Sequence, residues 1–449
     1  MSFLNNLFKS NRSRQSIDKE IQNALTLLQE GNFLEALEQL EEKRGDPGLT
    51  QYETKELLLG LAECYFKRLL NLRGRDVANH ALPICKRMDD SFGIGICSYY
   101  LNNYSGAIPA LSKAIKTPNI QKHVWKHGKS LITLGHCYYS TGKKKQALDF
   151  YQQAIQACSK AKDQVGEAET HLWLGLLSAE ALLHAGIREA GTRNKAFEAS
   201  KDIYAPSNFA LLCLTARGKK PLEERAVEAY NHLKTTVEFD EGTEDYLTLG
   251  FAYRTLAWLD LLHGDLTQGE KHILRAAENF DKLENTFYAG VCYFALGLAK
   301  KDTPIFLLDA VDLFGKAAKS YESVETPSPL NIGNAYLQQA HCILNLSQVS
   351  KAASTRQHPL FSIPDMSAPL VKQAQQAYEK SIMWFEKDIG RGLSSLGPAE
   401  LNLGKCLMLQ GKVASARDHF KKAEKYYLLV GRMDMAGRAS ELARQAWGK

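Results

Sequence analysis

The residues from 128 to 161 constrain this chain most, because small and aromatic side chains recur there at helical spacing. Gly135 lies on the apolar face of one expected helix, Gly142 interrupts that helix, and Ala147 lies on the matching face of a second helix. The other residues that share these two faces are Leu131, Leu134, Tyr138, Tyr151 and Ala154. Small side chains at Gly135 and Ala147 let two helices cross closely. The stretch therefore predicts a pair of antiparallel helices.

The same spacing recurs elsewhere in the chain. A first-helix glycine precedes a second-helix alanine by 12 residues in three places, at Gly95 and Ala107, Gly135 and Ala147, and Gly404 and Ala416. At 449 residues the chain is longer than most single compact domains. The recurrence therefore indicates an array of helix pairs rather than one core.

The Leu-Gly, Tyr, Gly, Ala and aromatic positions of 128–161 resemble the tetratricopeptide repeat. Leu174-Gly175 follows Leu134-Gly135 by 40 residues, so part of the chain is similar to a subgroup with longer repeats. The resemblance implies an all-α fold, a right-handed superhelical solenoid of antiparallel helix pairs with a C-terminal capping helix.

We expect the following organisation. It comprises a flexible basic and apolar tail (1–16), a first array (17–184), an irregular helical break (185–245), a second array (246–430) with an inserted loop (347–371), and a capping helix (431–449). The loop, with its three prolines, could be a partner-binding arm, an internal plug or a tolerated insertion. The tail, from 1 to 14, could contact a membrane surface or a partner, or be a frayed terminus.

The resemblance implies that first helices line a concave groove that binds a peptide or a helix of another protein. The residues that it places there are Tyr99, Tyr100, Lys129, His136, Tyr139, Arg254, Trp258, Asn402, Lys405 and Met408. Each aromatic could instead pack between neighbouring helices. A clamp for acidic peptide C-termini, used by one subgroup, is not expected here, because only Asn402 and Lys405 are compatible and the preceding repeat does not supply the other half.

A basic stretch from 122 to 129 places lysines and histidines around Trp125. It could hold an acidic partner or a phosphate, or it could be a solvated helix start. His123 and His127 are four residues apart, but no third metal ligand is apparent. We therefore expect no metal at this stretch.

The remaining features argue against an enzyme. No phosphate-binding loop, dinucleotide fingerprint, HExxH or GxSxG motif is present, and we expect no cofactor. The net charge of +6 is small for the length, which argues against nucleic acid as the partner. The nine cysteines have no paired spacing and are expected to be buried fillers in a reducing compartment.

We expect a cytoplasmic protein, because no run of about 18 apolar residues and no secretory signal are found. The leading hypothesis is a protein-interaction scaffold or adaptor. The alternatives are a peptide-sensing regulator and, with less support, an RNA-binding repeat protein. The sequence does not indicate the oligomeric state.

Overall fold

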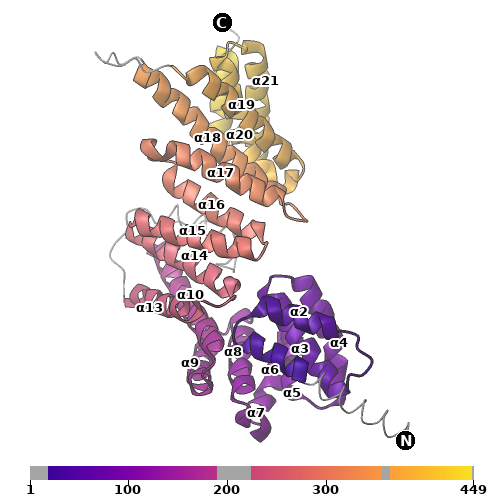
Figure 1. The fold of residues 1–449 in the computed structure, drawn as a ribbon. Helices are drawn as coiled ribbons and strands as arrows, with labels where there is room; N and C mark the ends of the chain where they lie inside the picture. The colour runs from indigo at the N-terminus through magenta and orange to yellow at the C-terminus, as the bar shows by residue number, and fades with distance from the viewer. Residues whose placement is uncertain (1–18, 190–223, 355–364, 447–449) are drawn as a thin grey trace, which may run out of the picture. The chain divides into compact units, whose positions relative to one another are not determined.

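The computed structural model describes residues 19–189, 224–354 and 365–446. The described residues divide into an N-terminal unit, 19–189 with 224–259, and a C-terminal unit from 260 onward. The regular structure in both is helical, and consecutive helices pack as pairs (Figure 1). The prediction of an all-α array of helix pairs is confirmed.

The N-terminal unit begins with the helical residues 19–29. Its further helices are α2 (Phe33–Lys43), α3 (Gln51–Lys67), α4 (Asn71–Arg87), α5 (Ser91–Tyr100), α6 (Tyr104–Ala114), α7 (Pro118–Lys122), α8 (Val124–Ser140), α9 (Lys144–Ala161), α10 (Gln164–Glu189) and α13 (Glu224–Asp240). Helix α14 (Tyr246–His263) contains the division between the units, after Leu259.

The C-terminal unit continues with the same kind of pairing. Its helices are α15 (Leu266–Lys282), α16 (Thr286–Lys300), the short η1 (Pro304–Phe306), α17 (Leu307–Glu322), α18 (Pro329–Ser354), α19 (Ser367–Glu386), α20 (Ile389–Leu409), α21 (Val413–Leu429) and α22 (Met433–Gln445).

Glycines allow the paired helices to approach closely in both units. A Cβ atom on Gly135 of α8 would lie 2.4 Å from the Tyr151 ring of α9. A Cβ atom on Gly404 of α20 would lie 2.5 Å from the Phe420 ring of α21. Contacts this short cannot be made by alanine, because the aromatic ring is packed on its other side. The expected role of these small residues is therefore confirmed.

One of the two expected irregular segments, the inserted loop, is more helical than predicted. The loop expected at 347–371 is shorter, because α18 continues to Ser354 and α19 begins at Ser367. Ser347 is buried within α18, and no glycine or proline lies between Ser347 and Ser354. Within the break expected at 185–245, α10 extends to Glu189 and α13 covers Glu224–Asp240. The tail at 1–16 and the centres of both irregular segments lie outside the described residues.

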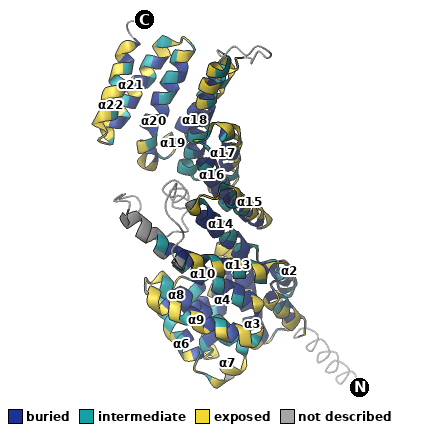
Figure 2. Ribbon diagram, turned by 90° about the vertical axis from the view of Figure 1, so that its left-hand side faces the viewer, coloured by how far each residue is buried: buried dark blue, intermediate teal, exposed yellow. Residues whose placement is uncertain are grey.

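Helix α22 covers the end of the last pair. Ala436, Ala439 and Ala443 are buried, whereas Arg438 and Arg444 are exposed. Figure 2 shows this division into a buried and an exposed side along α21 and α22. A polar outer face of this kind keeps the apolar surface of the final pair out of water.

The eight cysteines of the described residues are free and buried. Burial raises the pKa of the Cys137 thiol to about 12, which keeps the side chain neutral and apolar. The expectation that these cysteines fill small spaces between helices is confirmed for the described part of the chain. Among the same residues, no helix has both the length and the apolar character that crossing a membrane requires.

Candidate partner-binding site

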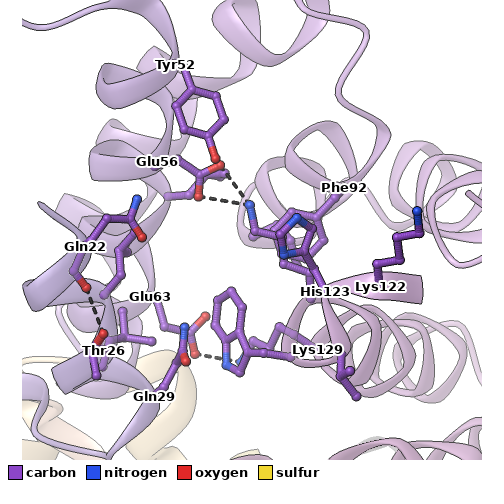
Figure 3. A pocket seen from close by; sticks show the side chains of 18 residues that line it. Gln22, Thr26, Gln29, Tyr52, Glu56, Glu63, Phe92, Lys122, His123 and Lys129 are labelled. Carbon is purple, nitrogen blue, oxygen red and sulfur yellow. Dashed lines mark hydrogen bonds and ion pairs between the residues drawn. The ribbon is translucent and has the colours of Figure 1, made fainter. Parts of the chain in front are cut away.

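A pocket of about 350 Å³ lies inside the N-terminal unit. Its lining comes from the helical residues 19–29, from α3 and α5, and from the end of α7, His123 and the first turns of α8. Figure 3 shows Gln22, Thr26 and Gln29 on one side of the pocket, and His123 and Lys122 on the other. The pocket therefore lies between first helices of successive pairs, as the repeat pattern predicts for a groove.

The floor of the pocket is apolar. Phe92 of α5 is buried, and the Trp125 ring contacts it edge to face with centroids 6.4 Å apart. The rim is polar and accessible, because Gln22, Lys122 and His123 are exposed. An aromatic floor inside a polar rim is the arrangement found where proteins anchor a partner side chain.

Two lysines of α8 contact carboxylates of α3 at the pocket wall. The Lys126 ammonium lies 2.8 and 3.0 Å from the two Glu56 carboxylate oxygens, as the dashed lines in Figure 3 mark. The Lys129 ammonium lies 2.7 Å from Glu63 Oε1. These ion pairs hold α3 and α8 together, and they leave the wall close to neutral.

Beneath this wall lies a larger cluster of ionisable groups, which we call the charged interior. Its members are Glu63, Lys67, Lys129, His136, Glu169 and Asp245. The Lys67 ammonium lies 2.6 Å from Asp245 Oδ2 and 3.1 Å from Glu169 Oε2. Lys129 also approaches Glu169, at 3.4 Å. The cluster joins α3, α8, α10 and the residue before α14, so it connects helices that are far apart in sequence.

Lys67 and Glu169 keep their charges because each lies beside groups of opposite charge. Burial alone would lower the pKa of Lys67, but the Asp245 and Glu169 carboxylates outweigh it and hold that pKa well above its usual value. Burial alone would raise the pKa of Glu169, but Lys129 and Lys67 hold it well below its usual value. Lys67 and Glu169 are therefore both charged at neutral pH.

His136 is the neutral member of the cluster. Burial lowers its pKa despite the neighbouring Glu169. Its Nε2 lies 3.0 Å from Glu169 Oε1, and its Nδ1 lies 2.7 Å from the Tyr151 hydroxyl. A carboxylate only accepts hydrogen bonds, so Nε2 carries the proton and Nδ1 accepts from Tyr151. This fixes the orientation of the ring.

A contact between distant turns closes the N-terminal unit around the charged interior. The Glu244 amide donates to the Gly31 carbonyl at 3.1 Å, and the Leu34 amide donates to Glu244 Oε2 at 3.1 Å. Helix α2 has no local side-chain cap, so a residue about 210 positions away supplies the carboxylate at its N-terminus. Gly31 has a φ of 83° at this contact. We call this contact the clasp.

The structure brings together the residues of the first array that the resemblance places in a groove. Tyr99 lies between Tyr100 and His136, with ring centroids 5.4 and 5.7 Å away. The Tyr100 hydroxyl donates to Glu63, and Lys129 lines the pocket itself. Tyr139 is half-buried beside Trp173. Of these five, Lys129 lines the pocket, and the others pack in or beside the charged interior.

The other candidates lie apart from this pocket. Arg254 and Trp258 of α14 are buried, with exposed fractions of 2% and 3%. Asn402, Lys405 and Met408 are half-buried on α20, and the first two line a separate pocket in the C-terminal unit. A partner-binding role for these five residues remains a prediction.

Sequence reasoning missed the pocket residues of α3. Tyr52, Glu56 and Glu63 line the pocket, and together with Lys67 they recur at helical spacing along one face of a helix that is otherwise largely apolar and buried. Polar side chains aligned on one face of a buried helix are a signal that could have pointed to these positions. The basic stretch from 122 to 129, in contrast, does contribute to the pocket.

His123 is the N-cap residue of α8, which begins at Val124, whereas His127 lies inside the helix. The two histidines are therefore not on consecutive turns of one helix. Among the residues that the structure describes, no group of three or more metal-ligating side chains is arranged to hold an ion.

No family model matches the chain, and no curated protein matches it. Among solved structures, it is similar to a Rap protein complexed with Competence and Sporulation Factor, with 12% identity, 96% of this chain and 99% of that chain covered, and a TM-score of 0.44. It is similar to the apo form of RapI, with 10% identity, 93% and 98% covered, and a TM-score of 0.43.

A STAND protein with a tetratricopeptide repeat sensor from Pyrococcus horikoshii is similar at 12% identity, with 97% of this chain and 64% of that chain covered and a TM-score of 0.39. The consecutive helix pairs and the glycine contacts that recur within them are described above. The described residues form an all-α array of consecutive helix pairs.

Proposed function

We propose that this chain is a non-catalytic scaffold that binds a segment of another protein in the pocket between residues 19–29, α3, α5 and α8. The observation that carries the proposal is the pocket itself, in which an aromatic floor at Phe92 and Trp125 is open to solvent through a polar rim. Binding energy at protein interfaces concentrates where an anchor side chain enters such a pocket.

The size and charge of the pocket indicate the kind of segment. At about 350 Å³ it takes an apolar anchor and its immediate neighbours rather than a whole helix. The wall lysines are already paired with Glu56 and Glu63. The exposed Lys122 and His123 add positive charge at the rim. We therefore expect an apolar residue flanked by polar or acidic ones.

Lys129, the most deeply buried lysine of the pocket wall, is poorly suited to proton transfer. Burial alone would lower the pKa of Lys129, but the Glu169 and Glu63 carboxylates raise it, so the ammonium keeps its proton at neutral pH. A general base or acid needs a pKa near the working pH. This supports binding rather than catalysis as the role of the site.

A peptide-display selection against the full chain tests the proposal, followed by affinity measurements on the selected sequences. The test variant combines Tyr52→Ala with Lys122→Glu, since both side chains are exposed at the rim. We expect it to weaken binding about tenfold or more, because an aromatic contact is lost and a charge is reversed. The matched control is Lys116→Glu, an exposed lysine outside the pocket.

Unchanged helical circular dichroism in both variants shows that the fold is retained. Equal binding by the wild type and the rim variant would place the contact elsewhere and overturn the proposal for this pocket. Recovery of RNA instead of any peptide from a native extract, with affinity that falls steeply with salt, would overturn the scaffold function itself.

A further inference from the structure

A second pocket, of about 400 Å³, lies in the C-terminal unit between α20, the end of α21 and α22. Its lining includes the cationic side chains of Lys405, Arg432 and Arg438, and no acidic residue is among the described residues that line it. Arg432 lies 3.5 Å from Asp434. In the described part of the chain, no ion pair joins Lys405 or Arg438 to a carboxylate.

Neutral groups take the place of carboxylates beside Lys405. Its ammonium donates to Asn402 Oδ1 at 2.9 Å, and the Asn402 amide nitrogen lies 3.1 Å from His341 Nε2 on α18. On the same helix, Gln338 accepts from Lys301 at 3.0 Å. We call Lys301, Gln338, His341, Asn402, Lys405 and Arg438 the cation row. The ammonium groups of its two lysines donate hydrogen bonds to side-chain amides. An amide accepts a hydrogen bond but carries no negative charge, so the positive charge is not compensated.

The surroundings of Lys405 show the energetic consequence. Burial lowers its pKa, and the Arg438 guanidinium lowers it further. Burial, followed by Lys301 and Lys405, lowers the pKa of His341 to about 4, so this histidine is neutral and adds no charge. A site that disfavours its own cation gains free energy when an anion enters it.

The rest of the pocket is apolar. Val430 and Met435 are half-buried, and Leu401 contributes to the same lining. Tyr427 also lines the pocket but is only 3% exposed, so its ring face is not open for a nucleotide base to stack on. Cations beside an apolar wall match a segment that carries acidic and apolar side chains together.

We infer that this pocket binds an acidic segment of a partner polypeptide, with a carboxylate between Lys405 and Arg438 and an apolar side chain against Val430 and Met435. The guanidinium offers the forked donors that a carboxylate accepts in pairs. The inference goes beyond the proposed function, because this pocket belongs to the other unit and shares no residue with the first.

The probe for the test is a short fluorescein-labelled peptide in which glutamate alternates with leucine and methionine. Its counterpart carries glutamine in place of glutamate. Fluorescence anisotropy with the full chain measures both affinities. The test variant is Arg438→Glu, and the matched control is Arg444→Glu, which makes the same charge change at an exposed position of α22 outside the pocket.

We expect Arg438→Glu to weaken binding of the glutamate peptide about tenfold or more, and Arg444→Glu to change it by less than about twofold. The glutamine peptide should bind weakly to all three proteins. Lys405→Gln provides a second test variant, since it keeps a polar side chain beside Asn402 and removes the charge.

Three outcomes would overturn the inference. They are equal binding of the two peptides, equal loss in Arg438→Glu and Arg444→Glu, and displacement of the peptide by a single-stranded oligonucleotide at lower concentration than by unlabelled peptide. Loss of binding in Lys122→Glu but not in Arg438→Glu would assign the acidic peptide to the N-terminal pocket. The two sites are thereby tested separately.

Discussion

A lysine of the charged interior in the N-terminal unit and a lysine of the cation row in the C-terminal unit have opposite surroundings: Lys67 is buried and Lys405 is half-buried. Lys67 is in contact with two carboxylates, from Asp245 and Glu169. Lys405 is in contact with an amide, and Arg438 lines the same pocket. Both lysines lie on first helices of their pairs, α3 and α20. The position in the repeat is therefore similar, and the difference lies in what other helices supply.

Because of that difference, we expect the charges of the charged interior to stabilise the fold and those of the cation row to act when a ligand binds. Removing one partner of a buried ion pair leaves an uncompensated charge and is strongly destabilising. Removing a cation that has no counter-charge relieves a cost instead. We expect the first cluster to stabilise the fold, and the second to be completed by a partner.

The largest expected effect is at Lys67. Lys67→Met leaves the Asp245 and Glu169 carboxylates buried without their ammonium, and we expect a loss of about 3–5 kcal/mol in the free energy of unfolding. Denaturant titration of the full chain, followed by circular dichroism, measures it. Lys113→Met is the control, because its pair with Asp89 is on the surface and contributes less than about 1 kcal/mol. Similar losses of unfolding free energy in Lys67→Met and Lys113→Met would contradict the structural role assigned to the charged interior.

Acid should act on the cation row through His341. Its folded-state pKa of about 4 is below the value of about 6.5 expected in the unfolded chain. The unfolded chain therefore binds this proton first, and the stabilisation is complete above about pH 6.5 and is lost as the pH falls toward 4, by about 3 kcal/mol.

The His341→Gln variant should lack this part of the pH dependence. Stability measured for both proteins across that pH range gives the difference directly. A saturating acidic peptide should raise the pKa of His341 and so flatten the wild-type curve. Parallel curves of stability against pH for the wild type and the variant would show that the pKa of His341 is not lowered by burial, and would contradict this prediction.

The clasp gives a smaller effect with a close control. Gly31 and Gly411 both have positive φ, at 83° and 76°, so alanine costs about 1 kcal/mol at either site. A Cβ on Gly31 would also lie 3.0 Å from Thr243 Cβ and 3.1 Å from Val165 Cγ2, whereas nothing lies within 4 Å at Gly411.

We therefore expect Gly31→Ala to cost about 2 kcal/mol and Gly411→Ala about 1 kcal/mol. Thermal unfolding of the two variants distinguishes these values. Hydrogen exchange at the Glu244 and Leu34 amides should increase only in Gly31→Ala. Equal costs would mean that the clasp adapts to the extra methyl group.

The smallest effect is expected at Lys405. In the absence of any peptide, Lys405→Met should leave the free energy of unfolding within about 1 kcal/mol of the wild type, or raise it, because no carboxylate loses a partner. Thermal melts in the presence and absence of the glutamate peptide sharpen the contrast, since only the wild type should be stabilised by the peptide. A loss in the free energy of unfolding as large as that of Lys67→Met would remove the distinction between the charged interior and the cation row.

The sequence by itself determined the local architecture. The glycine-to-alanine spacing at Gly135 and Gly404 predicted where helices cross, because a missing side chain permits a close approach that any larger residue prevents. The helix expected at 431–449 is likewise present as α22, with three alanines buried along one side. These features depend on neighbours within one or two helical turns, or on the next helix, and are therefore readable from spacing.

Spacing was less informative where no strong breaker is present. The loop expected at 347–371 is shortened at its start, because serine, alanine and lysine are compatible with helix when a face such as that of Ser347 is buried. It is shortened at its end because Pro369 lies in the first turn of α19, where a proline is tolerated. Composition alone therefore overestimated the irregular segment.

Only the tertiary structure decided how the charges combine. Nothing in the spacing of Glu63 or Lys67 indicates that Glu169 and Asp245 lie beside them, since those partners follow 100 or more residues later in the chain. The same holds for the Glu244 carboxylate at the start of α2. Whether a lysine on a first helix is compensated or left for a partner depends on long-range packing, because Coulomb interactions and desolvation act through space and not along the sequence.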